Sequence, residues 1–209
     1  MNHSAPSSAQ VAPESRPALR RALRKSRTAL GMGRRLNLSR RLSAYIARQD
    51  WLRPGAAIGL YAHMGSEVAT DELRALALRR GCRLYLPRII NYRTYVMVFS
   101  HDRGRRLRPS RIGINEPPAG LDLDVRRLDV VLMPLVGFDS AGNRLGNGAG
   151  YYDRLLAGTG ASGTRPLLVG LGFECQRLAQ LTTAPHDIPL DAVVSERGVQ
   201  FFRERSYRA

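Results

Sequence analysis

A glycine-rich stretch that follows a long apolar run constrains the fold more than any other part of the chain. The apolar run covers residues 130–138 and predicts a buried strand, which a polar turn over 139–143 closes. Glycines then alternate with small residues over 146–150, and apolar positions at helical spacing follow from Tyr151. This order predicts a strand, a loop and a helix whose N-terminus, with the loop amides, forms a phosphate cradle.

The side chains around the glycine loop suit an anionic ligand. Glycine permits positive φ values and lets the backbone approach a ligand closely. Arg144 precedes the glycines and can donate two hydrogen bonds to phosphate oxygens, and Asp153 can hold a metal ion bound to those phosphates. The spacing fits neither the Walker loop nor the dinucleotide fingerprint. A surface turn without any ligand therefore stays open as the alternative.

Length and cysteine content limit the class of protein. A chain of 209 residues is long enough to bury one substantial core. No apolar run reaches the length of a membrane span, and the first residues lack the apolar core of a secretory signal. Cys82 and Cys175 are too far apart for a zinc motif or a disulfide framework, so we expect both to be packing residues. We expect a cytoplasmic monomer with no membrane segment.

The charge balance is strongly basic. The chain has 33 Lys and Arg residues against 17 Asp and Glu residues, a net charge of +16. Such a charge attracts polyanions, so a basic nucleic-acid-binding α/β protein is one alternative function. Aromatic side chains for base stacking are few among the arginines. We therefore expect nucleic acid to bind only through non-specific charge attraction.

Hydrophobic periodicity predicts the organisation of the N-terminal half. Residues 1–15 are rich in Ser, Ala and Pro without periodicity, which predicts a disordered tail, and a single domain is expected over 16–209. One helix is predicted to begin at Arg16, with most of its arginines on a solvated face, and a second carries apolar residues over 38–46. Trp51 and Leu52 are expected to anchor the end of the second helix.

The remaining pattern alternates strands and helices. A strand over 56–61, a helix between Thr70 as N-cap and Gly81 as C-cap, and a strand over 83–86 form a unit typical of parallel sheets. Further elements are expected as strands over 95–99, 167–173 and 192–194, an irregular excursion over 100–124, a small-residue loop over 158–163, and a short helix over 175–181. The predicted fold class is α/β, a largely parallel or mixed sheet flanked by helices in a Rossmann-like three-layer arrangement.

Residues 143–153, with the sequence NRLGNGAGYYD, resemble the signature of the 5-formyltetrahydrofolate cyclo-ligase (5,10-methenyltetrahydrofolate synthetase) family. Supporting segments follow in the family's order at 16–20, 66–70, 84–88, 113–117 and 187–191. The resemblance covers roughly residues 16 to 202. It implies an ATP- and Mg²⁺-dependent cyclisation of 5-formyltetrahydrofolate to 5,10-methenyltetrahydrofolate, with release of ADP and phosphate. Another phosphotransfer enzyme, with a different substrate on the same ATP cradle, is the remaining alternative.

The implied chemistry begins when the formyl oxygen attacks the γ-phosphate. N10 then attacks the formyl carbon and phosphate departs. Phosphoryl transfer depends chiefly on positioning and on neutralisation of charge. The resemblance assigns catalytic roles to Arg144 and Tyr151. It implies ATP binding by Arg16, Arg20, Arg144, Leu145, Gly146, Asn147, Gly148, Ala149, Gly150, Tyr151 and Tyr152.

The resemblance also implies a folate site and a metal site. It assigns substrate binding to Glu67, Ile112, Asn147, Gly148, Gly150 and Tyr151. Glu67 would accept hydrogen bonds from the pterin amine and ring N–H, although a carboxylate there can also cap the following helix. Mg²⁺ would be held by Asp153 and Asp187, with Asp191 as the local rival. Ile112 stands where related proteins often place an aromatic side chain against folate.

Overall fold

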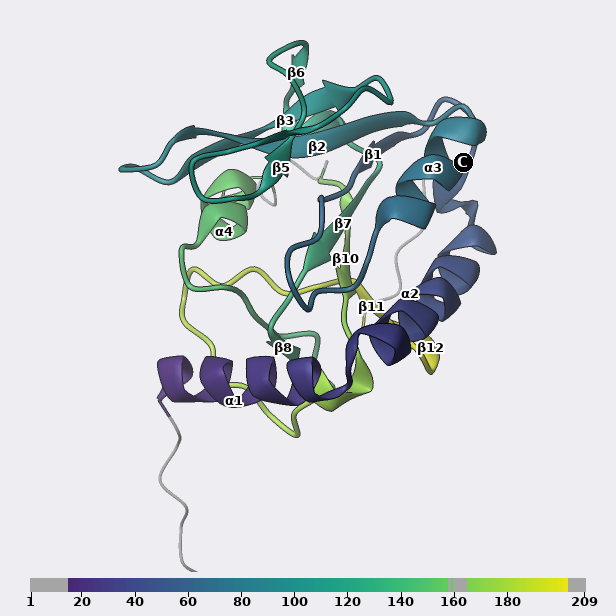
Figure 1. Cartoon of the computed structure of the whole chain (residues 1–209). Coiled ribbons are helices and arrows are strands. Elements are labelled where there is room, and N and C mark those ends of the chain that lie inside the picture. The colour runs from purple at the N-terminus through teal and green to yellow at the C-terminus, as the bar shows by residue number, and fades with distance from the viewer. Residues whose placement is uncertain (1–14, 158, 160–164, 203–209) are drawn as a thin grey trace, which may run out of the picture.

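The structure, a computed structural model, describes residues 15–157, 159 and 165–202 (Figure 1). The predicted tail, except for Ser15, and most of the predicted loop over 158–163 lie outside the described residues. The helices are α1 (Arg16–Ala29), α2 (Met32–Ala47), α3 (Asp71–Arg79) and α4 (Tyr151–Leu156), with 3-10 turns η1 (Asp50–Leu52), η2 (Val125–Arg127) and η3 (Glu174–Gln176). The strands are β1 (Ala57–Gly59), β2 (Arg83–Asn91), β3 (Val96–Asp102), β4 (Arg108–Pro109), β5 (Asn115–Glu116), β6 (Asp122–Leu123), β7 (Val130–Pro134), β8 (Gly137–Phe138), β9 (Arg144–Leu145), β10 (Leu167–Leu171), β11 (Ala192–Ser195) and β12 (Gly198–Phe201).

One eight-stranded mixed sheet organises the molecule. Its strand order is β12-β11-β10-β7-β1-β2-β3-β6. The five strands β11, β10, β7, β1 and β2 run parallel, whereas β12, β3 and β6 are antiparallel to their neighbours. Parallel strands are normally covered on both faces, which explains the continuous apolar runs in the sequence.

Apolar side chains cover both faces of this sheet. On one face, Leu132 and Val169 belong to a core cluster with Leu42 of α2. On the other face, the alternate residues Val131 and Leu168 belong to a second cluster, with α4 and nearby coil. Figure 1 shows α2 and α3 on one side of the sheet and the short α4 on the other. The predicted mixed α/β fold flanked by helices is confirmed, although one face has less helical cover than a three-layer arrangement suggests.

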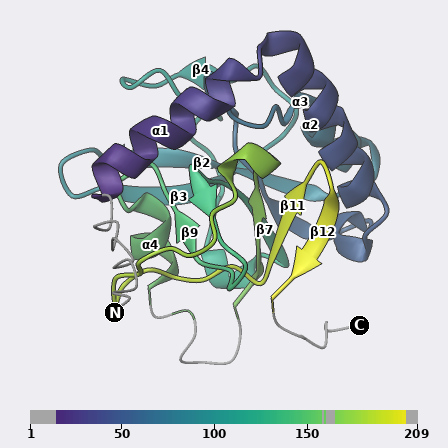
Figure 2. The same cartoon turned by 90° about the horizontal axis from the view of Figure 1, so that it is seen from below.

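Helix α1 runs across the end of the sheet rather than along a face (Figures 1 and 2). It begins with proline in its first turn, where a missing N–H costs nothing. Its Leu23 packs into a small third cluster with Val136, Leu145 and Leu181. The apolar side of α1 therefore packs against the segments before and after the turn over 139–143. This position brings the arginines of α1 close to the glycine loop.

The run over 130–138 was predicted as one strand, and this prediction is wrong. β7 ends at Pro134, which has no N–H to continue a ladder. The chain then forms a separate hairpin in which β8 pairs with β9, with Phe138 opposite Arg144. Asp139 organises the turn between them, because its carboxylate accepts the amides of Ala141 and Asn143. The hairpin delivers Arg144 directly to the start of the glycine loop.

Two further local predictions need correction. No helix forms over 175–181; the segment contains only the 3-10 turn η3, and Leu178 N then donates to Phe138 O at 2.8 Å. Thr70 does precede α3, but its hydroxyl donates to Tyr61 O at 2.6 Å instead of capping the helix. The excursion after β3 is irregular as predicted, apart from the two-residue strands β4, β5 and β6.

The remaining expectations concern cysteines and membranes. Cys82 and Cys175 are both free thiols, and both belong to or pack against the core under α2 and α3. Burial raises the pKa of each thiol, which suits a packing role. Within the described part of the chain, none of the helices has the length and apolar character needed to cross a bilayer.

Candidate active site

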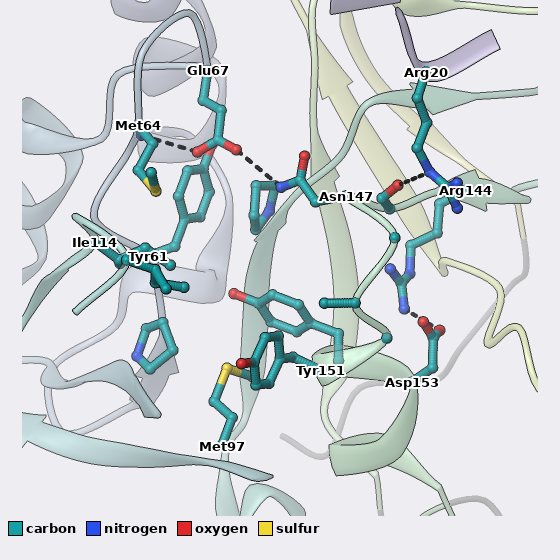
Figure 3. A pocket seen from close by; sticks show the side chains of 18 of the residues that line it. Arg20, Tyr61, Met64, Glu67, Met97, Ile114, Arg144, Asn147, Tyr151 and Asp153 are labelled. Carbon is teal, nitrogen blue, oxygen red and sulfur yellow. Dashed lines mark hydrogen bonds and ion pairs between the residues drawn. The ribbon is translucent and has the colours of Figure 1, made fainter. Parts of the chain in front are cut away.

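A cavity of about 860 Å³ lies where the loop after β1, the glycine loop and α1 meet. Its other walls come from β2, β3, the excursion after β3 and the loop over 184–187. This volume is in the range of small-molecule and cofactor sites. The close-up in Figure 3 shows one side lined by Tyr61, Met64, Met97 and Ile114, and the other by Arg20, Arg144 and Asp153.

The glycine loop forms the centre of the cavity wall. Gly148 has a φ of +109° and Gly150 a φ of +68°, values that L side chains rarely adopt. A Cβ at Gly148 would also lie 3.4 Å from Cζ of Arg20. Arg20 Nε donates to the carbonyl of Gly146 at 2.9 Å, so α1 contacts this loop directly. The positive φ therefore favours glycine at 148, and a Cβ there would only make an ordinary contact with Arg20.

Arginines from two parts of the chain enter the cavity with carboxylates beside them. Arg144 Nη2 donates to Asp153 Oδ1, and Arg16 Nη1 donates to Asp187 Oδ2 at 2.7 Å. The Nε atoms of Arg16 and Arg144 are buried and have no hydrogen-bond partner among the described residues. Buried donors are nearly always paired. These two unsatisfied donors therefore point to an acceptor that a bound anion would supply.

Asp187 and Asp191, the alternative candidates for the second metal carboxylate, differ in their access to the cavity. Asp187 lines the cavity, whereas Asp191 is fully buried and accepts hydrogen bonds from Arg165 and from Leu168 N. Burial favours a higher pKa for Asp187, but hydrogen bonds from Arg16 and the Ala184 amide outweigh it and hold the pKa below its ordinary value. The carboxylate at 187 is therefore an anion that faces the site.

The residues present fit one Mg²⁺ ion shared with a ligand. The described residues contain no group of three or more His, Cys, Asp or Glu side chains arranged to hold a metal. Mg²⁺ in phosphate sites is commonly bound by only one or two carboxylates, with phosphate oxygens and waters completing the shell. Asp153 and Asp187, which both line the cavity, supply that number.

Glu67 lies opposite the arginines, in the loop after β1. Its Oε2 accepts the amide of Met64 at 3.0 Å, and its Oε1 accepts Nδ2 of Asn147 at 3.3 Å (Figure 3). The second contact joins this loop to the glycine loop across 80 residues of sequence. The carboxylate thus bonds within its own loop and to Asn147 rather than to the first turn of α3.

The remaining predicted residues divide into two groups. Ile112, Ala149, Tyr151 and Tyr152 line the cavity, and burial raises the pKa of both tyrosines, so their hydroxyls stay protonated. Leu145 does not line it, because its side chain is fully buried in the small cluster under α1. Only the backbone of Leu145 can belong to the loop.

Two arginines on α1, Arg24 and Arg27, were not among the predicted site residues. Arg27 is 5% exposed, in contrast to the solvated face expected for most arginines of this helix; its Nε donates to Ser66 Oγ at 3.0 Å and its Nη1 to Leu135 O at 3.3 Å. Arg24 Nη2 donates to Asn147 Oδ1 at 3.0 Å. Both line the cavity with Arg16 and Arg20. The spacing i, i+4, i+8 and i+11 puts the four arginines on one face of a helix, which was the available signal.

The fold and the cavity define an α/β protein in which an arginine-lined glycine loop faces an apolar wall that carries the carboxylates of Glu67 and Glu116. The model of the 5-formyltetrahydrofolate cyclo-ligase family matches residues 12–196. The chain therefore belongs to the 5-formyltetrahydrofolate cyclo-ligase family.

Individual relatives agree with this assignment. The 5-formyltetrahydrofolate cyclo-ligase of Escherichia coli K12 is 36% identical over 145 residues, which cover 66% of this chain and 76% of the relative. The cyclo-ligase of Mus musculus is 29% identical over 189 residues, covering 85% of this chain and 92% of the relative. The NMR structure of Aquifex aeolicus 5,10-methenyltetrahydrofolate synthetase superimposes with a TM-score of 0.78 at 28% identity, covering 93% of this chain and 96% of that one.

Proposed function

We propose that this chain catalyses the ATP- and Mg²⁺-dependent cyclisation of 5-formyltetrahydrofolate to 5,10-methenyltetrahydrofolate, with release of ADP and phosphate. The observation that carries the proposal is the contact between Asn147 of the glycine loop and Glu67. It supports the proposal because it joins the glycine loop, which would hold the phosphates, to a carboxylate that would suit a pterin, and both line the same cavity. The reaction needs both, because the formyl oxygen has to meet the γ-phosphate.

The arginine side of the cavity would hold the triphosphate. The unsatisfied Nε donors of Arg16 and Arg144 would reach phosphate oxygens, and Arg20 already lies against the glycine loop. Backbone amides between Gly146 and Tyr151 would complete the cradle. These donors are in place before the ligand arrives, and such preorganised charge is the main contribution a protein makes to phosphoryl transfer.

Asp153 and Asp187 would hold Mg²⁺ together with the phosphates. The ion would supply neutralisation of the charge on the transferred phosphoryl group. Each carboxylate contacts an arginine that also faces the ligand. Binding of the nucleotide would therefore exchange arginine–carboxylate pairs for arginine–phosphate pairs, leaving the carboxylates for the metal.

The apolar side would hold the folate. Glu67 would accept the amine and ring N–H of the pterin, a pair of neutral donors matched to one carboxylate. Tyr61, Met64, Met97 and Ile114 would cover the faces of the ring system. Tyr151 lies between the apolar and the charged sides (Figure 3). At that position it would orient the formyl group and shield it from water.

The test is direct. Purified protein incubated with 5-formyltetrahydrofolate, ATP and Mg²⁺ should develop the absorbance of the methenyl product, and omission of any one component should abolish it. Arg144→Met, which removes a predicted phosphate donor, is the inactive control, and its folding is checked by circular dichroism. A folded wild-type protein that hydrolyses ATP but forms no methenyl product would point to a different acceptor on the same cradle.

A further inference from the structure

The turn between β2 and β3, residues 91–96, does not line the cavity but contacts Tyr151, which does. Asn91 Oδ1 accepts the amides of Arg93 and Thr94, which closes the turn. Tyr95 then adopts a φ of +56°, and among the described residues it is the one non-glycine residue with a positive φ. Such a conformation is unfavourable for an aromatic residue and persists where surrounding contacts fix it.

The contacts of Tyr95 lead to the glycine loop and to Tyr151, the residue that follows it. Its ring centroid lies 5.6 Å from that of Tyr151, in an edge-to-face arrangement with an interplanar angle of 72°. The guanidinium of Arg154 lies over the same ring, with Cζ 4.9 Å from the centroid. Arg154 Nη1 also donates to the carbonyl of Ala149. Tyr95 and Arg154 thus connect the turn to Tyr151 and to the glycine loop.

Tyr151 stands at the start of a short helix, next to the glycine loop. It is the first residue of the six-residue helix α4, and its N-cap Gly150 offers no side chain to hold the helix start. The glycine loop before it carries no large side chain that could pack against the ring. The neighbouring aromatic ring of Tyr95 supplies a directional contact from another part of the sheet.

We propose that Tyr95 is a positioning residue for Tyr151: it holds the Tyr151 ring in the orientation that receives the folate. This inference rests on the proposed function, in which Tyr151 lies between folate and ATP. Tyr95 is 41% exposed and does not line the cavity, so it acts through Tyr151 rather than on the ligand. Its removal should therefore weaken folate binding and leave ATP binding nearly unchanged.

Tyr95→Gly is the informative variant, because glycine accepts the positive φ while the ring is removed. The KM for 5-formyltetrahydrofolate should rise about three- to tenfold, as expected for loss of one aromatic pair, with the KM for ATP unchanged. Tyr95→Phe keeps the ring and should restore the wild-type KM. Thr94→Gly, which adds backbone freedom at the adjacent exposed position without removing a ring, should have no effect on either KM.

A second step separates positioning from a general structural role. In a Tyr151→Ala background, Tyr95→Gly should cause no further rise in the folate KM, because the residue it acts through is already absent. Equal effects of Tyr95→Gly in both backgrounds would overturn the proposal. A rise in the KM for ATP that matched the rise for folate would also overturn it.

A third measurement does not depend on activity. In protein labelled with 3-fluorotyrosine, the ¹⁹F resonance of Tyr151, assigned by its loss in Tyr151→Phe, should be single and narrow. It should become broad or multiple in Tyr95→Gly and remain narrow in Tyr95→Phe. A narrow signal in Tyr95→Gly would refute positioning whatever the substrate. Broadening without any methenyl formation by the wild type would instead refute the proposed reaction and leave positioning intact.

Discussion

Arg144 and Asp153 form an ion pair directly beside the glycine loop, with 2.5 Å between Nη2 and Oδ1. The arginine side chain is 3% exposed and the aspartate side chain 17%. A buried guanidinium without a counter-charge is costly, so the ligand-free protein needs Asp153 to neutralise Arg144. The same carboxylate is one of the two proposed for Mg²⁺. Under that proposal, Asp153 would neutralise Arg144 in the free protein and Mg²⁺ in the nucleotide complex.

This pair predicts two effects of Asp153→Asn. Loss of the counter-charge should lower the free energy of unfolding by about 1–3 kcal/mol, measured by urea denaturation without ligand. Loss of the metal carboxylate should lower kcat and raise the Mg²⁺ concentration needed for half-maximal rate. Asp71→Asn, at an exposed carboxylate, is the control. If Asp153→Asn is destabilised but its Mg²⁺ requirement is unchanged, Asp153 only neutralises Arg144 and does not bind the metal.

Gly148→Val should leave the protein folded but remove ATP binding. A branched side chain cannot readily adopt the φ of +109°, and it would enter the space beside Arg20. We expect a loss of ATP affinity of roughly 100-fold or more, since several phosphate contacts are blocked together. Isothermal titration calorimetry measures it. Gly31→Val imposes similar backbone strain where nothing lies within 4 Å, and should leave ATP affinity intact.

Glu67→Gln should act on the folate and spare the nucleotide. The amide keeps the shape of the side chain but replaces one acceptor oxygen by a donor, which opposes the N–H groups of the pterin. A buried mismatch of this kind costs about 1–3 kcal/mol, or roughly ten- to hundredfold in folate affinity. Binding titrations with each ligand separately give the answer. Weakened ATP binding with unchanged folate binding would show that the two ligand positions have been assigned in reverse.

The stability of the β8–β9 hairpin, which precedes the glycine loop, should depend on pH because of Asp139. Burial favours a higher pKa for this carboxylate, but its hydrogen bonds from the Asn143 side chain and from the Leu181, Asn143 and Ala141 amides outweigh burial and lower the pKa. A lowered folded-state pKa means that the stabilisation is complete above the unfolded value of about 4 and is lost as pH falls through the folded value.

Asp139→Asn should therefore reduce the free energy of unfolding by about 2–4 kcal/mol at pH 7, with a smaller difference from wild type at pH 3. Urea denaturation at the two pH values measures this difference. Ser140→Ala, at the exposed next position of the turn, is the matched control and should show no such pH dependence. A constant difference between the two pH values would contradict the assigned pKa shift.

The net charge of +16 should not make the protein a specific nucleic-acid binder. Deletion of residues 1–14 should barely alter turnover, because α1 begins after them and Ser15, whose carbonyl accepts Leu19 N, is retained. RNA binding should be weak and should decrease steeply with added salt. Sequence-selective RNA binding at physiological salt, measured by fluorescence anisotropy, would contradict this expectation and favour the alternative function.

Local pattern was sufficient to predict much of the fold. The helices α2 and α3 follow from hydrophobic periodicity, and the parallel strands follow from apolar runs. Each helix buries one whole face and each strand buries both, so the pattern of apolar residues is visible in the sequence itself. The break inside 130–138 could not be found in this way. Phe138 leaves the sheet because it pairs with Arg144 across a turn, and an apolar run does not show which partner each of its residues will have.

The candidate site shows the same limit. Glycines, arginines and carboxylates near the loop were found because their chemistry is local to the motif. Burial of Arg27 depends on Ser66 and on the carbonyl of Leu135, which are 39 and 108 residues away in sequence. Pairing of Arg16 with Asp187 spans 171 residues. Charge alone identifies such groups as candidates, and only the folded chain assigns their partners.

The continuity of the cavity from Glu67 to Arg144 has a consequence for inhibitor design. A single molecule that links a pterin-like ring to a phosphate mimic would occupy both sides without crossing protein. Once its first end binds, the second end is held at a high effective concentration near its own subsite. Such a bisubstrate compound should bind far more tightly than either fragment. A spacer too short to pass Tyr151 would prevent both ends from binding at once, and the gain in affinity would be lost.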